Sequence, residues 1–172
     1  MNTTILKLEP AIALSENQFF TLCQQNPDLK IERSCQGDLI IMPPTGGETG
    51  RKNAELIADF IIWNRQSKLG IVFDSSTCFR LPNGSDRSPD VAWLKKERWE
   101  SLTPEQQRKF PPLCPDFVLE LLSPSDNLSF TQAKMQEYQA NGVQLAWLLN
   151  PQDQQVEIYR LGYPVEILFR PR

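Results

Sequence analysis

The sequence predicts an α/β fold with a mixed central β-sheet flanked by helices. Two observations lead to it: helical patterns alternate with short strand-like runs, and the second half of the chain reads strand, strand, helix, strand. A third is the run FVLELL (117–122), which is apolar on both faces apart from Glu120. Because successive strand side chains point to opposite faces, such a run needs cover on both sides and is predicted at the centre of the sheet.

The first half of the chain is predicted to contain a short helix, a hairpin and a longer helix. Ser15 is a candidate N-cap for the helix in LSENQFFTLCQQN (14–26). KIERSCQGDLIIMPP (30–44) has two strand-like halves around a turn at Gln36-Gly37-Asp38. After a glycine-containing loop, residues 51–69 form a helix with an apolar side made of Ala54, Ile57, Ala58, Ile61 and Ile62.

The second half is predicted to be rich in strands. In chain order it holds the strand-like runs IVFDSSTCFRL (71–81) and PDVAWL (89–94), a polar surface excursion with one or two helical turns (95–115), FVLELL, a helix at about 130–141 with its capping box at Ser129 and Gln132, the strand QLAWLLN (144–150), and a terminal hairpin from QVEIYR (155–160) to VEILFR (165–170).

Length and composition predict one domain over residues 1–172. A hydrophobic content of 40% is enough for a core. No run approaches the roughly 18 to 20 apolar residues of a membrane span, and MNTTILKLEP lacks the features of a signal peptide. We therefore expect a cytoplasmic protein with no membrane partner.

The absence of histidine restricts the chemistry more than any motif. With no histidine in the chain, imidazole-dependent hydrolase triads and histidine metal ligands are excluded. The four cysteines show no C-x-x-C pairing and read as reduced, mostly buried thiols. A metal ion here would be held by oxygen ligands, which favours Mg²⁺ or Mn²⁺.

The charge distribution is compatible with a local contact to nucleic acid. A net charge of −3 argues against a broad basic surface for nonspecific polyanion binding. One short segment is nevertheless basic and would supply backbone contacts from Arg80, Arg87 or Lys95.

Glu120 needs a partner, because an unpaired ionised carboxylate among leucines is costly to bury. Asp116 is about 13 Å away along the strand and is better explained as a residue of the strand entry. Asp90 opens the run DVAWL. If the two strands are neighbours, Asp90 and Glu120 face each other at about 5 Å between their Cβ atoms. A divalent cation between them would relieve their repulsion.

Lys134 is the third candidate site residue. On the predicted helix it shares a stripe with Phe130 and Tyr138, which should face the sheet. Its aliphatic stem would either run out to solvent along this face or turn its ammonium group toward the carboxylates. In the second case it would orient a water molecule or stabilise charge developing on a phosphate.

Four motifs in the second half of the chain stand out: SPD (88–90), PDFVLELLSPSD (115–126), KMQEYQANGV (134–143) and WLLNP (147–151). Together with the early GDLIIMPPTGGE (37–48), they resemble the Uma-type family of putative restriction endonucleases, within the PD-(D/E)XK nuclease superfamily. The resemblance covers nearly the whole chain and implies a restriction-endonuclease-like core.

The resemblance also implies roles for particular residues. Asp90 and Glu120 would bind the metal ion, with the backbone carbonyl of Leu121 as a further ligand. Leu122 stands where the superfamily usually has its lysine, and Lys134 on the following helix would replace it. A glutamate at the first core helix would complete the site; Glu48 is preferred to Glu55.

These expectations define one leading function and two alternatives. The leading one is a Mg²⁺- or Mn²⁺-dependent endonuclease that hydrolyses phosphodiester bonds of DNA. The first alternative is a noncatalytic nucleic-acid-binding or assembly module in which lysine or arginine neutralises the acids. The second is hydrolysis of a small phosphate ester. Trp93, Trp99 or a sheet edge would be the candidates for a homodimer contact.

Overall fold

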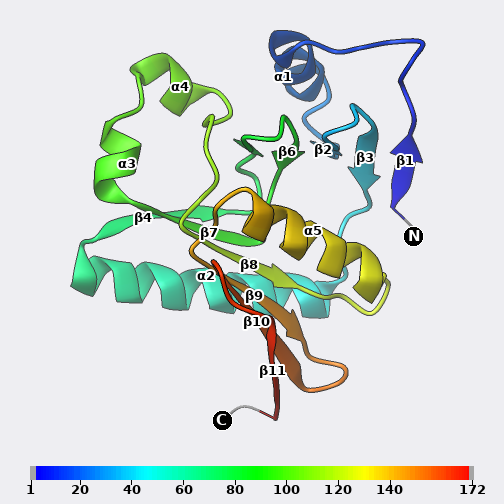
Figure 1. Ribbon diagram of the computed structural model, residues 1–172. Helices are drawn as coiled ribbons and strands as arrows, with labels where there is room; N and C mark the ends of the chain where they lie inside the picture. Colours follow the sequence, from blue (N-terminus) through cyan, green and yellow to red (C-terminus); the bar gives the residue numbers. More distant parts are fainter. Residues whose placement is uncertain (1–2, 171–172) are drawn as a thin grey trace.

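The computed structural model of the chain describes residues 3–170 and contains two β-sheets (Figure 1). The larger sheet has six strands in the order β11-β10-β9-β8-β7-β4. In chain order they are β4 (Gly70–Asp74), β7 (Val91–Lys95), β8 (Phe117–Leu121), β9 (Leu145–Asn150), β10 (Gln155–Arg160) and β11 (Glu166–Phe169). The β8–β9 pair is parallel and the others are antiparallel, so the predicted mixed sheet is confirmed.

The smaller sheet is antiparallel and has the order β1-β3-β2-β6-β5. Its strands are β1 (Thr4–Leu6), β2 (Lys30–Arg33), β3 (Leu39–Met42), β5 (Phe79–Arg80) and β6 (Asp86–Arg87). The predicted hairpin around Gly37 is confirmed as β2–β3, with Gly37 at φ 89° in the turn. The sequence does not predict a second sheet, because β5 and β6 are too short to show a pattern.

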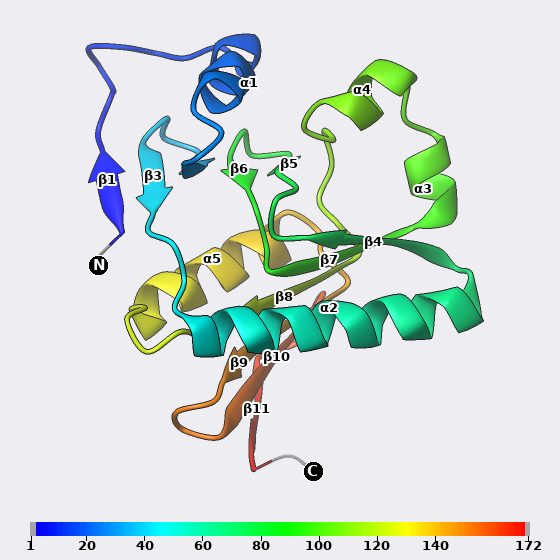
Figure 2. The ribbon, with the colours of Figure 1, turned by 180° about the vertical axis from the view of Figure 1, so that it is seen from behind.

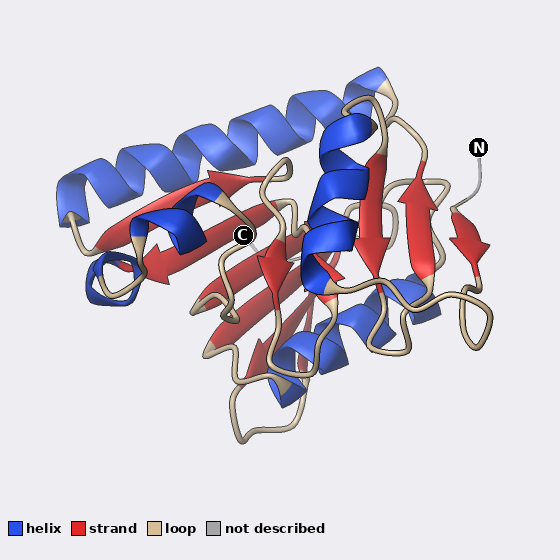
Figure 3. Cartoon of the chain, turned by 90° about the horizontal axis from the view of Figure 1, so that it is seen from above, coloured by secondary structure: helices blue, strands red, loops and turns tan. Residues whose placement is uncertain are grey.

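Two helices cover opposite faces of the larger sheet (Figures 2 and 3). They are α2 (Gly47–Ser67) and α5 (Leu128–Ala140); the others are α1 (Glu16–Gln25), α3 (Lys96–Glu100) and α4 (Pro104–Arg108). The predicted cap of α1 is confirmed, because the Ser15 side chain accepts from the backbone N–H of Gln18. The predicted capping box of α5 is wrong: the Asn127 side chain accepts from Phe130 N–H, so the helix begins earlier.

All five residues of β8 are buried, which confirms the central position predicted for FVLELL. On one face Phe117, Leu119 and Leu121 pack against Leu56, Ile57 and Phe60 of α2. The stripe predicted for α2 is therefore shifted, and Ile62 is 54% exposed. On the other face Val118 and Leu122 pack against Met135 and Tyr138 of α5.

The segment Ser88-Pro89-Asp90 carries the chain from one sheet to the other. It follows β6 of the smaller sheet and leads into β7 of the larger sheet. This crossing sets Asp90 directly before β7. All four cysteines are free. Among residues 3–170, no helix has the length and hydropathy needed to cross a membrane.

Gly70 gives a direct test of the packing between β4 and β7. A Cβ added there would overlap the Leu94 carbonyl oxygen and the ring of Trp93, so we expect Gly70→Ala to destabilise the fold by about 2–3 kcal/mol. Gly50→Ala is the matched control, since nothing lies within 4 Å of its added Cβ and alanine favours the helix. Urea unfolding of both variants checks this; equal midpoints would contradict the packing.

Candidate active site

Asp90 and Glu120 lie on neighbouring strands. In the antiparallel β7–β8 pair Val91 lies opposite Leu119, and extending this register by one residue sets Asp90 opposite Glu120. The Asp90 carboxylate accepts a hydrogen bond from the backbone N–H of Leu121 at 2.8 Å. Asp116 lies elsewhere, accepting from Lys95 N–H and pairing with Arg98. The structural role predicted for Asp116 is confirmed.

Lys134 of α5 reaches inward. Its Nζ atom lies 2.7 Å from Oε1 of Glu120 and 2.7 Å from Oε1 of Glu32 on β2. The Tyr138 hydroxyl also donates to Oε1 of Glu120, at 3.1 Å. Of the two alternatives left open by the sequence, the structure therefore shows the ammonium group turned toward the carboxylates. Phe130, which was expected beside Lys134, is 40% exposed.

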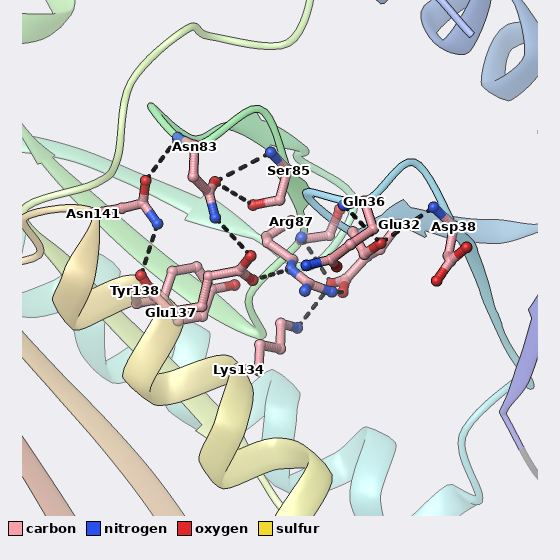
Figure 4. A network of polar contacts seen from close by, with 12 residues as sticks. Glu32, Gln36, Asp38, Asn83, Ser85, Arg87, Lys134, Glu137, Tyr138 and Asn141 are labelled. Atoms are coloured by element: carbon pink, nitrogen blue, oxygen red, sulfur yellow. Dashed lines mark hydrogen bonds and ion pairs between the residues drawn. The ribbon is translucent and has the colours of Figure 1, made fainter. Parts of the chain in front are cut away.

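Glu32 belongs to the same buried network, although the sequence did not single it out (Figure 4). Its Oε1 atom accepts from Ser88 N–H at 2.9 Å, and its Oε2 atom accepts from Arg87 at 3.1 Å. Arg87 also donates to Glu137 of α5 at 2.6 Å. One signal was available: the adjacent charges Glu32 and Arg33 point to opposite faces of their strand, so a strand covered on either face must bury one of them.

The expectation that Arg80 and Arg87 contact a nucleic-acid backbone is wrong. Arg80 pairs with Asp86 and Glu16, and Arg87 pairs with Glu32 and Glu137. Both side chains, carried by β5 and β6 of the smaller sheet, are largely buried. Lys95 is exposed, so its ammonium group remains accessible.

The electrostatic environment shifts the pKa values of the two buried glutamates, Glu120 and Glu32, in opposite directions. Burial raises the pKa of Glu120 to about 7; Lys134 opposes this shift, and the charges of Asp90 and Glu32 add to it. Burial also acts to raise the pKa of Glu32, but Lys134 and Arg87 outweigh it and lower that pKa to about 2. Desolvation acts to lower the pKa of Lys134, yet Glu120 and Glu32 raise it above its ordinary value. Lys134 is therefore a charged hydrogen-bond donor at neutral pH.

The network carries more negative than positive charge. When ionised, its acids contribute four negative charges and its two bases two positive charges, which leaves −2. The acids are Asp90, Glu120, Glu32 and Glu137, and the bases are Lys134 and Arg87. Such an excess in a buried region favours either protonation or a bound cation.

Asn53 of α2 is the helix residue that contacts Asp90. Its Nδ2 atom donates to Asp90 at 3.4 Å, and its Oδ1 atom is buried with no hydrogen-bond partner among residues 3–170. Glu48 and Glu55, the acids considered on this helix, are exposed and pair with Lys52 and Arg51. The sequence missed Asn53 because an amide within a helical pattern carries no distinguishing signal.

Two cavities adjoin the end of β8. A cavity of about 190 Å³ is lined by Glu48, Lys52, Leu121 and Leu122, among others. A larger one of about 550 Å³ shares Lys52, Leu121 and Pro151 with the first and continues toward Arg170. Leu121, adjacent to Glu120, thus borders accessible space, and Glu48 faces the site across the smaller cavity without contacting Asp90 or Glu120 in the structure.

The oxygen atoms of the site fit a small hard cation. Asp90 and Glu120 supply carboxylates, the Leu121 carbonyl points toward the Asp90 side because its N–H does, and Asn53 Oδ1 is an unsatisfied acceptor nearby. Within the described residues, no three or more His, Cys, Asp or Glu side chains are grouped to hold a metal ion. Two carboxylates suffice for Mg²⁺, which usually keeps several of its waters.

Comparison with known proteins defines the class and then the family. The fold is similar to that of a putative nuclease belonging to DUF820 from Anabaena variabilis ATCC 29413. The TM-score is 0.73 at 18% identity over 90% of this chain and 83% of that one. The restriction-endonuclease-like α/β fold is thus confirmed. The family profile of Uma2, described as putative restriction endonuclease, matches residues 17–171, and the chain belongs to this family. No curated protein matches the chain.

The low pKa of Glu32 predicts a loss of stability in acid. Its pKa in the folded state is about 2, below the ordinary 4.5, so Glu32 stabilises the fold above pH 4.5 and loses this contribution as the pH falls toward 2. We expect Glu32→Gln to lower the free energy of unfolding at pH 7 by on the order of 3 kcal/mol.

Urea unfolding at pH 7 and pH 3 measures this effect. The difference between wild type and Glu32→Gln should shrink at pH 3. Glu105→Gln, which removes a surface charge paired with Lys109, is the control and should leave the midpoint unchanged. A gap between wild type and Glu32→Gln that is the same at both pH values would show that the carboxylate charge is not the source of the stability.

Proposed function

We propose that this protein is a Mg²⁺- or Mn²⁺-dependent endonuclease that hydrolyses phosphodiester bonds of DNA. The observation that carries the proposal is the meeting of Asp90, Glu120 and Lys134, from two adjacent strands and the helix that covers them. Membership of a family described as putative restriction endonucleases supports a nuclease rather than a hydrolase of small phosphate esters.

Asp90, Glu120 and the carbonyl oxygen of Leu121 would hold the metal ion. When bound, the ion would supply Lewis acidity and lower the pKa of a water molecule. Glu48 would reach such a site only by leaving Lys52, since its carboxylate is now paired 2.8 Å from that ammonium group. We therefore assign Glu48 an auxiliary role at most, and the two strand acids the main one.

Lys134 would act as a fixed positive charge. Its raised pKa makes it a poor base at neutral pH but a good donor to a phosphate oxygen or to the attacking water. Glu32 and Glu120 hold its ammonium group from two sides, so the group is already oriented before a substrate binds. Such preorganisation is what electrostatic stabilisation of a transition state requires.

Lys95 is the remaining candidate, among those considered, for contact with the DNA backbone. It ends β7, is exposed, and is followed by Lys96, which pairs with Glu100 one helical turn later. Exposed lysines at a strand end would supply charge that is independent of base sequence.

A noncatalytic nucleic-acid-binding or assembly module is the alternative. The observation that favours it is the pairing of Glu120 and Glu32 with Lys134 and Arg87, which compensates much of the buried charge without an ion. In that case the network would serve to join the two sheets. Metal binding and cleavage separate the two functions.

Cleavage assays test the enzymatic proposal. With plasmid DNA and Mg²⁺ or Mn²⁺, we expect Asp90→Asn, Glu120→Gln and Lys134→Met each to lower the rate by about 100-fold or more, because each removes a metal ligand or the fixed charge. Glu105→Gln is the surface control and should cleave like wild type. If wild type and Glu120→Gln are equally inert on DNA and RNA with either metal, the enzymatic proposal is wrong.

Thermal unfolding tests the metal site independently of activity. An ion that binds only the folded state stabilises it by about 2.7 kcal/mol at 100 times its Kd, so millimolar Mn²⁺ should raise the Tm of wild type. Asp90→Asn should abolish most of this rise, whereas Glu105→Gln should keep it. A wild-type Tm that is indifferent to both Mg²⁺ and Mn²⁺ would favour the noncatalytic alternative.

A further inference from the structure

The exposed apolar surface at the C-terminal edge of the larger sheet is not used by the proposed site. β11 has one neighbour among the described strands, β10, and all four of its residues are exposed. Its exposed fractions reach 47% at Ile167 and 69% at Phe169, and Tyr163 before it is 68% exposed. An uncovered apolar edge strand favours pairing with another strand.

The opposite edge of the same sheet is protected. The residues of β4 are mostly half-buried or buried, and α3 packs on this strand. The tryptophans expected at a homodimer contact are also occupied: Trp93 donates to Asn64, and Trp99 packs on Phe73. Of the candidates from the sequence, the sheet edge is therefore the one that the structure leaves open.

We propose that β11 pairs antiparallel with β11 of a second copy of this chain, forming one continuous sheet through a two-fold homodimer. β11 contains none of the proposed catalytic residues, so the proposal does not depend on the enzymatic function. A sheet edge that pairs with its own copy is self-complementary by symmetry.

The backbone pattern restricts the register of this pairing. Arg170 N–H donates to the Gln154 carbonyl, and Leu168 lies opposite Val156 in the same ladder. Because hydrogen-bonded and non-hydrogen-bonded positions alternate, Ile167 and Phe169 direct their backbone groups to the free edge. In a two-fold dimer, Ile167 or Phe169 must therefore lie opposite Ile167 or Phe169 of the second copy.

Charge selects one register from this set. With Leu168 on the two-fold axis, Ile167 lies opposite Phe169 of the second copy, and Glu166 lies opposite its Arg170. Each dimer then gains two aromatic–aliphatic pairs. This register also brings the guanidinium group of Arg170, the residue after β11 (φ 51°), to Glu166, which already pairs with Arg160 of its own chain, so each Glu166 gains a second basic partner. With Ile167 on the axis, Glu166 would instead lie opposite Leu168 and gain no second ionic partner.

The same register brings the second copy to the larger cavity. Arg170 lines that cavity, so Glu166 of the second copy would stand beside its rim. The homodimer would thereby close one side of the space that borders Leu121.

Mass measurement by light scattering over a range of concentrations tests the dimer. Wild type should reach twice the mass of one chain, and Ile167→Lys with Phe169→Lys should stay monomeric. Both side chains are exposed, so their replacement should not disturb folding, which circular dichroism checks. A wild type that stays monomeric at 100 µM, or a lysine variant that still dimerises, would overturn the proposal.

Charge reversal tests the ionic pairs. Arg170→Glu should weaken the dimer by about tenfold, because it sets two negative charges opposite each other at both ends of the interface. Because Glu166 also pairs with Arg160 within the chain, the restoring variant adds Arg160→Glu and Glu166→Arg, which reverses every charge of the group and should recover the dimer. A triple variant that is no tighter than Arg170→Glu alone would show that the register is wrong.

Disulfide trapping tests the register directly in a Cys35→Ser background, which removes the exposed cysteine. Leu168→Cys should form an intermolecular disulfide, because directly opposite positions across the axis lie about 4.5 Å apart between Cα atoms. Ile167→Cys should not, since diagonal positions are about 7–8 Å apart. Cross-linking at position 167 but not at 168, or at neither, would contradict the proposal.

Discussion

The rest of the structure depends on the two ion pairs made by the ammonium group of Lys134. It lies 2.7 Å from a carboxylate of each sheet, Glu32 in the smaller and Glu120 in the larger. Removing any of these charges from water is costly, and the cost is offset only while all three remain together. The two ion pairs therefore fix the position of α5 against both sheets. Apolar packing alone would fix it less specifically, because the hydrophobic effect has no preferred direction.

The same constraint prepares the site for chemistry. A lysine held from two sides loses its rotational freedom during folding rather than during reaction, and its charge is directed at the end of β8. Arg87 contributes indirectly, because it satisfies the second oxygen of Glu32 and leaves the first for Lys134. Arg87 of β6 thus supports the network, whereas Arg80 of β5 pairs with Asp86 and Glu16 outside it.

The periodicity of side chains within one strand or one helix predicted the features that depend only on residues close in sequence. The alternation in 117–122 located the central strand, and helical spacing placed Lys134 on the face of α5 toward the sheet. Glu32 was not predicted, because its partner lies 102 residues away and no pattern in KIER reveals that pairing. Arg80 and Arg87 were expected to contact a nucleic-acid backbone because their segment is basic. The two-residue strands that carry them are too short to show a pattern, and their place in the smaller sheet follows from pairing with each other and with β2, which is distant in sequence.

The excess charge of the network connects its structural and proposed catalytic roles. Two carboxylates, Glu32 and Glu120, lie 2.7 Å from the ammonium group of Lys134. Burial, together with repulsion from Asp90 and Glu32, raises the pKa of Glu120 to about 7 although Lys134 opposes the shift. A proton on Glu120 would relieve the repulsion but weaken its bond to Lys134, whereas a cation at Asp90 and Glu120 would relieve it and keep that bond. If the proposed function holds, a cation would therefore preserve both the contact between the sheets and the oriented lysine, and a phosphodiesterase would use the same ion in its chemistry.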